Sequence, residues 1–340
     1  MYKLRLKASA FAMSYLSNEE KVREQVRSLH PHTDKPAPFV GAGGVKVSAV
    51  CFTHKFYKNI RDYITHMNDY VAAAAASGSQ MIAFPELCGM AAISVMPGFS
   101  ALYADIKKFQ EADTETQKDA LFTLCETVQG FVGEIFYNTF SQLAQSHRII
   151  IAAGGFYQLE DRQLYNRQFL FSETGEVAGR QDKLFLAPWE RQVGVTAGTR
   201  VTPGDTHIGR VALLDGLALK HYEPFWIAST SGCAFAVTGA TPFTVTDYAL
   251  TRYRAQEQGL CILSPGLLDD KSFGFSFSSP AGIYAPRAAT RSRDGIAAEG
   301  TDQAVFTARV DISRASAQFD LYSDDKNPRF FQHLLHQPNH

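Results

Sequence analysis

Hydrophobic positions recur at two different spacings along this chain. Ile60, Ile64, Met67 and Val71 recur at helical spacing, which predicts an amphipathic helix over Tyr57 to Ser77 that ends in an alanine run. Elsewhere, short apolar runs alternate with polar turn residues and are too brief for helices. The chain is therefore expected to mix helices and strands.

The short apolar runs predict the strands of at least one sheet. They cover Val45 to Phe52, Met81 to Phe84, Arg148 to Ala153, Tyr165 to Phe171, Val177 to Gln181, Arg210 to Leu214, Phe235 to Thr238 and Gly259 to Ser264. The segment Glu173-Thr-Gly-Glu176 predicts a hairpin turn between two of them, and a helix is expected over about Phe131 to His147. This alternation favours an α/β protein with sheets packed between helical layers.

Residues 1–44 read as an N-terminal extension that ends in Pro36, Pro38 and Gly41-Ala-Gly-Gly44, so the folded domain is expected to begin near Val45. Lys3 to Leu16 has a basic start, but its apolar run is short and interrupted, which argues against a secretory signal. No segment reaches the roughly 18 apolar residues of a membrane span.

Composition narrows the class of partner. The 340 residues are 45% hydrophobic, enough to bury a large core, and 33 basic against 34 acidic residues leave a formal charge of -1. A polybasic field for nucleic acid or an anionic membrane is therefore lacking, and the expected partner is a small molecule or another protein. Five scattered cysteines without zinc-site spacing indicate a reduced, cytoplasmic protein without a metal.

Several motifs carry candidate chemistry. In chain order they are Phe84-Pro85-Glu86-Leu87, Tyr165-Asn166, Gly175-Glu176-Val177 followed by Arg180-Gln181-Asp182-Lys183 and Glu190, Arg254-Ala-Gln-Glu257-Gln258-Gly259, Gly274-Phe-Ser276 to Pro280-Ala-Gly282, and Asn327-Pro328-Arg329. In this order they resemble the nitrilase superfamily of carbon-nitrogen hydrolases over about residues 45–335. Gln258 departs from the family's asparagine.

The resemblance implies a four-layer α-β-β-α sandwich, a homodimer or larger assembly, no cofactor, and a small amide, nitrile or carbamoyl compound as ligand. In the family a cysteine attacks the substrate carbon, a glutamate acts as base and a lysine stabilises the oxyanion. By resemblance, Glu86 is the base, Lys183 the lysine and Glu190 a second glutamate that positions groups in the pocket.

The family's cysteine block aligns without gaps on Gly209-Arg210-Val211, with Lys220 and Glu223 at its conserved charges. The nucleophilic cysteine then falls on Gly216, which has no side chain to attack with. Three interpretations follow. The chain is a pseudoenzyme with a retained binding pocket, a hydrolase with a relocated nucleophile or water activated by Glu86, or an engineered inactive variant of a working amidase.

Other residues near these motifs have two interpretations each. Cys88 is the candidate for a relocated nucleophile if the strand continues past Glu86, yet a lone cysteine is more often buried packing. Trp189 is either a wall of the pocket or packing, and Glu223 either borders the pocket or makes a salt bridge with Lys220. Asp215 is expected to point away from the pocket, because neighbours on a strand face opposite sides.

The segment Met96 to Gln129 is longer than expected between the Glu86 motif and the next helix. Its Pro97-Gly98 start is typical of a lid hinge over the pocket, and a surface excursion is the alternative interpretation.

Overall fold

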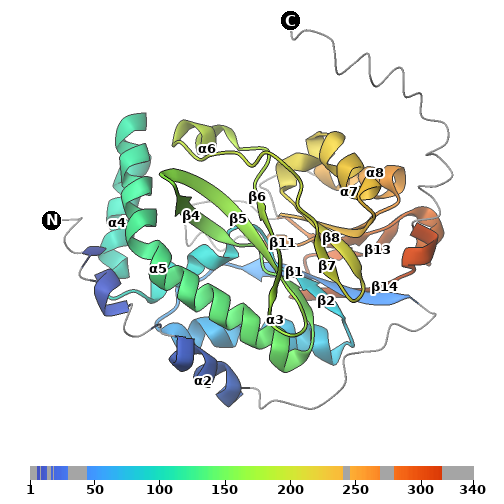
Figure 1. Cartoon of the computed structure of the whole chain (residues 1–340), viewed down its shortest axis with the longest axis horizontal. Coiled ribbons are helices and arrows are strands. Elements are labelled where there is room, and N and C mark those ends of the chain that lie inside the picture. The colour runs from blue at the N-terminus through green and yellow to red at the C-terminus, as the bar shows by residue number, and fades with distance from the viewer. Residues whose placement is uncertain are drawn as a thin grey trace, which may run out of the picture.

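The computed structural model describes residues 6–7, 9–13, 17, 19–29, 44–239, 246–268 and 279–315. Within these ranges the strands form one sheet of eight and one of six. The two sheets face one another, and helices cover their outer faces (Figure 1). The predicted four-layer α-β-β-α sandwich is confirmed. The motif residues Gly274 and Ser276, and Asn327-Pro328-Arg329, lie outside the described residues.

The first sheet has the order β11-β1-β2-β3-β5-β4, with β14 paired to β1 and β6 paired to β5. Its strands are β1 Val45–Thr53, β2 Met81–Ala83, β3 Ile150–Ala152, β4 Phe156–Glu160, β5 Gln163–Phe171, β6 Val177–Asp182, β11 Gly266–Leu268 and β14 Val305–Val310. Strands β1, β2 and β3 run parallel, so their carboxyl ends meet at one edge. In open α/β sheets this edge is where ligands bind.

The second sheet has the order β13-β12-β10-β9-β8-β7. Its strands are β7 Gly204–Thr206, β8 Gly209–Leu214, β9 Cys233–Thr238, β10 Cys261–Ser264, β12 Ala281–Tyr284 and β13 Ile296–Gly300. Here too the central strands β8, β9 and β10 are parallel. Polar residues that follow them share one edge.

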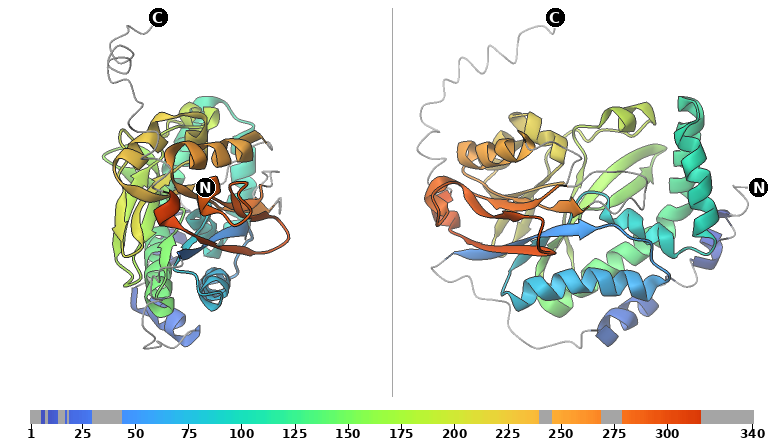
Figure 2. Two further views of the ribbon diagram at one scale, coloured as in Figure 1. Left: turned by 90° about the vertical axis from the view of Figure 1, so that its right-hand side faces the viewer. Right: turned by 180° about the vertical axis from the view of Figure 1, so that it is seen from behind.

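Alternation along the strands builds the layers. On β1, Val47 and Ala49 face the second sheet and pack in one cluster with Leu213 of β8, whereas Val50 and Phe52 face the helices. The helices are α2 Glu19–Leu29, α3 Ile60–Ala76, α4 Phe99–Gln110, α5 Thr114–His147, α6 Pro188–Gln192, α7 Glu223–Thr230 and α8 Thr246–Gln258, with 3₁₀ turns η1 Cys88–Val95, η2 Gly216–Lys220 and η3 Arg287–Ala289. Helices α3 and α5 cover the first sheet, and α7 and α8 cover the second (Figure 2).

The predicted helices α3 and α5 and the hairpin between β5 and β6 are confirmed, with one change of length. Helix α5 begins at Thr114, well before Phe131, because the Asp113 carboxylate caps it by accepting from Thr116 N at 3.0 Å. The long segment after Met96 therefore forms η1, α4 and the first half of α5.

The N-terminal extension also contributes to the core. Val22 and Val26 of α2 are fully buried in the same cluster as α3 and α5. The extension is thus packed on the outer helical layer through an amphipathic helix.

Candidate functional site

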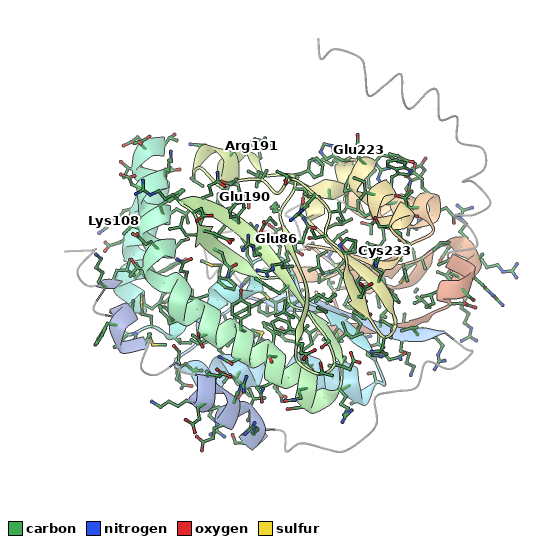
Figure 3. The ribbon with its side chains drawn as sticks, viewed as in Figure 1. Glu86, Lys108, Glu190, Arg191, Glu223 and Cys233 are labelled. Atoms are coloured by element: carbon green, nitrogen blue, oxygen red, sulfur yellow. The ribbon has the colours of Figure 1, made fainter. Side chains whose placement is uncertain are left out.

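Glu86 lies three residues beyond the end of β2, at the edge where the parallel strands of the first sheet stop. Its side chain is buried, with 9% of the residue exposed. Figure 3 shows Glu86 and Glu190 near one another in the interior of the molecule, whereas Lys108 and Glu223 lie at its margins. The fold therefore brings the Glu86 motif to the carboxyl ends of the strands, where open α/β sheets place their sites.

Lys183 joins the two glutamates. Its Nζ donates to Glu86 Oε1 at 2.6 Å and lies 2.9 Å from Glu190 Oε2. Lys183 follows β6 directly, and its backbone N–H donates to Asn166 O of β5 at 2.9 Å. The three residues assigned by resemblance therefore form one buried cluster.

Asn166 and Tyr157 complete the hydrogen bonds of this cluster. Asn166 Nδ2 donates to Glu86 Oε1 at 2.6 Å and to Glu190 Oε1 at 3.1 Å, and Tyr157 OH donates to the same Glu190 oxygen at 3.2 Å. Glu190 Oε2 also accepts from Ala187 N at 2.8 Å, which caps helix α6. Glu190 is thus fixed by four donors.

Sequence reasoning gave Asn166 and Tyr157 no role. A polar asparagine inside the apolar run of β5 was a usable signal, because a buried amide requires partners. Tyr157 carried no such signal, since its hydroxyl reaches Glu190 through the pairing of β4 with β5.

Burial and neighbouring charges shift the pKa values in this cluster. Burial raises the pKa of Glu86; the Lys183 ammonium opposes this rise, and the carboxylates of Glu190 and Asp215 add to it. Burial alone lowers the pKa of Lys183, but the charges of Glu86 and Glu190 outweigh it and hold the pKa above its usual value. Lys183 therefore stays protonated at neutral pH, as an oxyanion-stabilising cation must.

Asp215 belongs to this cluster, and the expectation that it points away is wrong. Strand β8 ends at Leu214, so strand alternation does not extend to Asp215, which instead caps η2. Its Oδ2 accepts from Leu184 N at 3.1 Å and Phe185 N at 3.3 Å, and its Oδ1 accepts from Ala218 N at 2.9 Å. Burial raises the pKa of this carboxyl, opposed by the Lys183 charge.

Gly216 comes directly after Asp215 and is the buried first residue of η2. Arg254 Nε donates to Leu219 O of this turn at 3.4 Å, so the Arg254 motif on α8 supports it. The turn that the alignment assigns to the family's cysteine is therefore held from both sides, by Asp215 and by α8.

Cys88 lies in a different environment from that required of a nucleophile. The strand stops at Ala83, Leu87 adopts a left-handed φ of 59°, and Cys88 begins η1. Its thiol donates to Ala153 O at 3.0 Å, is fully buried, and has a pKa raised by that burial. These conditions oppose formation of a thiolate.

The other candidates lie at the periphery of the cluster. Trp189 is 45% exposed, and its ring meets Tyr157 edge-on at 6.4 Å between centroids. Glu223 is exposed in the first turn of α7, and His221 stacks on Phe185 at 3.8 Å. Trp189 is therefore connected with the cluster through Tyr157, whereas Glu223 lies on the surface (Figure 3).

The segment after Met96 reaches the cluster indirectly. Cys125 of α5 packs with Tyr157 and Leu186 in a small apolar group, and Gln192 Nε2 of α6 donates to Thr114 Oγ1 at 2.9 Å. The first half of α5 thus buttresses the short helix that carries Glu190.

The sequence model of the family described as carbon-nitrogen hydrolase matches residues 46–218, about half of the chain, and this range holds the whole cluster. The chain belongs to the carbon-nitrogen hydrolase family. A curated relative, the "probable hydrolase YhcX" of Bacillus subtilis (strain 168), is 24% identical over 267 residues, which cover 75% of this chain and 47% of that protein. The chain thus spans about half the length of this relative.

Solved structures of carbon-nitrogen hydrolases share the fold. The Helicobacter pylori G27 enzyme superposes with a TM-score of 0.64 at 16% identity, covering 87% of this chain and 99% of that one. Nit3 of Saccharomyces cerevisiae, of the nitrilase superfamily, gives 0.60 at 15%, covering 87% and 100%. An amidase from Nesterenkonia sp. gives 0.59 at 15%, covering 88% and 100%.

Two searches of the described residues complete the picture of this family member. No helix among them is long and apolar enough to span a bilayer. In the same residues, no group of three or more His, Cys, Asp and Glu side chains is arranged to hold a metal ion. The carboxylates of the cluster are bound instead by Lys183, Asn166, Tyr157 and backbone N–H groups.

Proposed function

We propose that this carbon-nitrogen hydrolase homologue binds a small amide, nitrile or carbamoyl compound at the Glu86–Lys183–Glu190 cluster and does not hydrolyse it through a cysteine. The ammonium group of Lys183, shared between two buried carboxylates, is the observation that carries the proposal. It supplies a fixed cation for a carbonyl or nitrile dipole.

The end of β8 supports the non-covalent part of the proposal. The residues there are Leu214, Asp215 and Gly216, and the carboxylate of Asp215 is occupied by three backbone N–H donors. The related Nesterenkonia sp. AN1 amidase, by contrast, accepts acrylamide at an active-site cysteine. In this chain all five cysteines are free and buried, and burial raises the pKa of Cys88.

A second function, hydrolysis by water that Glu86 activates, is favoured by one observation. Glu86 Oε2 has no hydrogen-bond partner among the described residues, so this oxygen is available to take a proton from water. A carboxyl whose pKa is raised by burial is also a stronger base than an exposed one. This route needs neither Gly216 nor Cys88 as nucleophile.

One assay separates these functions. Ammonia release from small amides and nitriles is measured with the native chain, Glu86→Ala, Cys88→Ser and Gly216→Cys, alongside amide binding by ligand-observed NMR. The proposed function requires binding without ammonia release by the native chain. Turnover gained in Gly216→Cys would add that the pocket lacks only a thiol.

Other results would refute the proposal. Ammonia release that is lost in Glu86→Ala but kept in Cys88→Ser would establish water activation, and loss in Cys88→Ser would establish a relocated nucleophile. An absence of amide binding by the folded native chain would reject the binding function itself.

We further propose a homodimer in the cytoplasm. Ile227 of α7 and Tyr253 of α8 are 38% and 61% exposed on adjacent helices, which fits a subunit contact better than a solvated surface. Five free thiols fit a reducing compartment. Sedimentation of the native chain against Tyr253→Glu tests the assembly, with a dimer that dissociates in the variant as the expected result.

A further inference from the structure

Two buried acceptor atoms in the cluster have no donor in the part of the chain that the structure describes. They are Glu86 Oε2 and Asn166 Oδ1, which belong to residues with 9% and 0% exposure. A buried acceptor without a partner costs about 1–3 kcal/mol, so such atoms in a site usually await a ligand or water. Two of them side by side call for an N–H donor.

The orientation of the Asn166 amide follows from its contacts. Its nitrogen faces Glu86 Oε1 at 2.6 Å and Glu190 Oε1 at 3.1 Å, and ionised carboxylates only accept. A flipped amide would point its oxygen at both carboxylates. Asn166 Oδ1 therefore stays an acceptor without a protein donor, on the amide that holds Glu86.

The charge of the cluster favours a cationic donor. Lys183 interacts with the carboxylates of Glu86, Glu190 and Asp215, so negative groups outnumber the ammonium group. Glu190 and Asp215 have donors on both of their oxygens, and Glu86 has donors on Oε1. Glu86 Oε2 is the carboxylate oxygen of this set that is left to a ligand.

Space beside this oxygen depends on Gly239 at the end of β9. A methyl group at Gly239 would lie 2.9 Å from Glu86 Oε2, and Gly239 N donates to Leu214 O at 3.1 Å, directly before Asp215. The backbone next to Oε2 thus lacks a side chain, and the end of β8 lies alongside.

We propose that the ligand of this site presents a protonated nitrogen, as an amidinium or primary ammonium group, to Glu86 Oε2 and Asn166 Oδ1. Asp215 is the residue that biases the site toward this charge, by adding a third carboxylate beside Lys183. The inference rests on the proposed binding function and specifies its ligand class. Lys183 lies on the Oε1 side of Glu86, so the ligand's cation is bound on the other oxygen.

Acetamidinium and acetamide test the proposal, because they have nearly the same shape and differ by one charge. Their dissociation constants are measured by ligand-observed NMR with the native full-length chain at constant ionic strength. Acetamidinium is expected to bind at least about tenfold more tightly, since a nearby unpaired charge in a buried site is worth more than in water. This comparison needs no variant.

Asp215→Asn then isolates the third carboxylate. It is expected to reduce the ratio of the two dissociation constants by at least about threefold, whereas loss of the cap alone would weaken both ligands equally. Glu126→Gln, which removes an exposed charge from α5, is the matched control and leaves the ratio unchanged.

The outcomes are distinct. Equal or tighter binding of acetamide overturns the inference but leaves the proposed function, and so does a ratio that is unchanged in a folded Asp215→Asn variant. If neither compound binds, both fail. Ammonia release from acetamide refutes the proposed function alone, and the ratio still decides the ligand class.

Discussion

Lys183 and Glu86 are 97 positions apart in the chain, and a contact of 2.6 Å joins the Lys183 ammonium to the Glu86 carboxylate. Lys183 follows a strand of an antiparallel hairpin, whereas Glu86 follows a parallel strand. The pair is buried, with side-chain exposures of 6% and 8%. Each partner therefore depends on the other for its charge to remain in the interior.

Lys183→Met should lower the free energy of unfolding by about 3–5 kcal/mol, because it leaves buried carboxylates without their cation. Urea denaturation measures the change. Lys108→Met is the control, since Lys108 is 76% exposed and pairs only with Asp105 on α4, and it should leave the midpoint unchanged. Equal effects of the two substitutions would show that the Glu86–Lys183 pair contributes nothing.

Gly239→Ala should destabilise the protein by roughly 1–3 kcal/mol, because its methyl group would lie 2.8 Å from Glu86 Cβ and 2.9 Å from Glu86 Oε2. Gly130→Ala serves as the comparison on α5, where a methyl group meets nothing within 4 Å. That change should stabilise the helix by about 1 kcal/mol. Thermal denaturation of both variants gives the signs, and the same sign for both would contradict the packing at Glu86.

His66 should make the protein less stable as the pH falls below 6.5. Burial lowers the pKa of His66 from 6.5 to about 4, with the Lys55 and His54 charges adding to this. Between these values the unfolded chain binds the proton and the folded chain does not, so stability is full above pH 6.5 and is lost towards pH 4. The loss is roughly 1–2 kcal/mol after allowance for partial exposure of the ring.

The pH dependence is measured by urea denaturation between pH 4 and 8. The His66→Gln variant should lose this component of the acid limb, and His207→Gln, in the turn between β7 and β8, should keep it. An acid limb identical in the His66 variant and the native chain would contradict the assignment to His66.

The five thiols should resist alkylation in the folded protein at neutral pH. Every cysteine is buried, and burial raises the pKa of Cys88, of Cys261, and of Cys125 to about 12, so thiolate is scarce and inaccessible. Mass spectrometry after iodoacetamide treatment should show an unmodified native chain and five adducts in denaturant. Rapid selective labelling of Cys88 would revive it as a nucleophile.

The sequence by itself determined the family, the fold class and the first members of the cluster. Period changes along the chain reported the strands, because alternation is imposed locally by the pleat. Glu86, Lys183 and Glu190 were found through motif order. Their convergence in one buried cluster required only that the resemblance hold, and the printed contacts bear this out.

Only the tertiary structure decided the roles of Asp215, Asn166 and Tyr157. Asp215 joins the cluster because β8 stops one residue before it, and a strand's end depends on the pairing of β8 with β9. Tyr157 and Asn166 reach Glu190 because β4 pairs with β5 and α6 folds back onto them. Such contacts depend on long-range packing, which no local pattern of residues encodes.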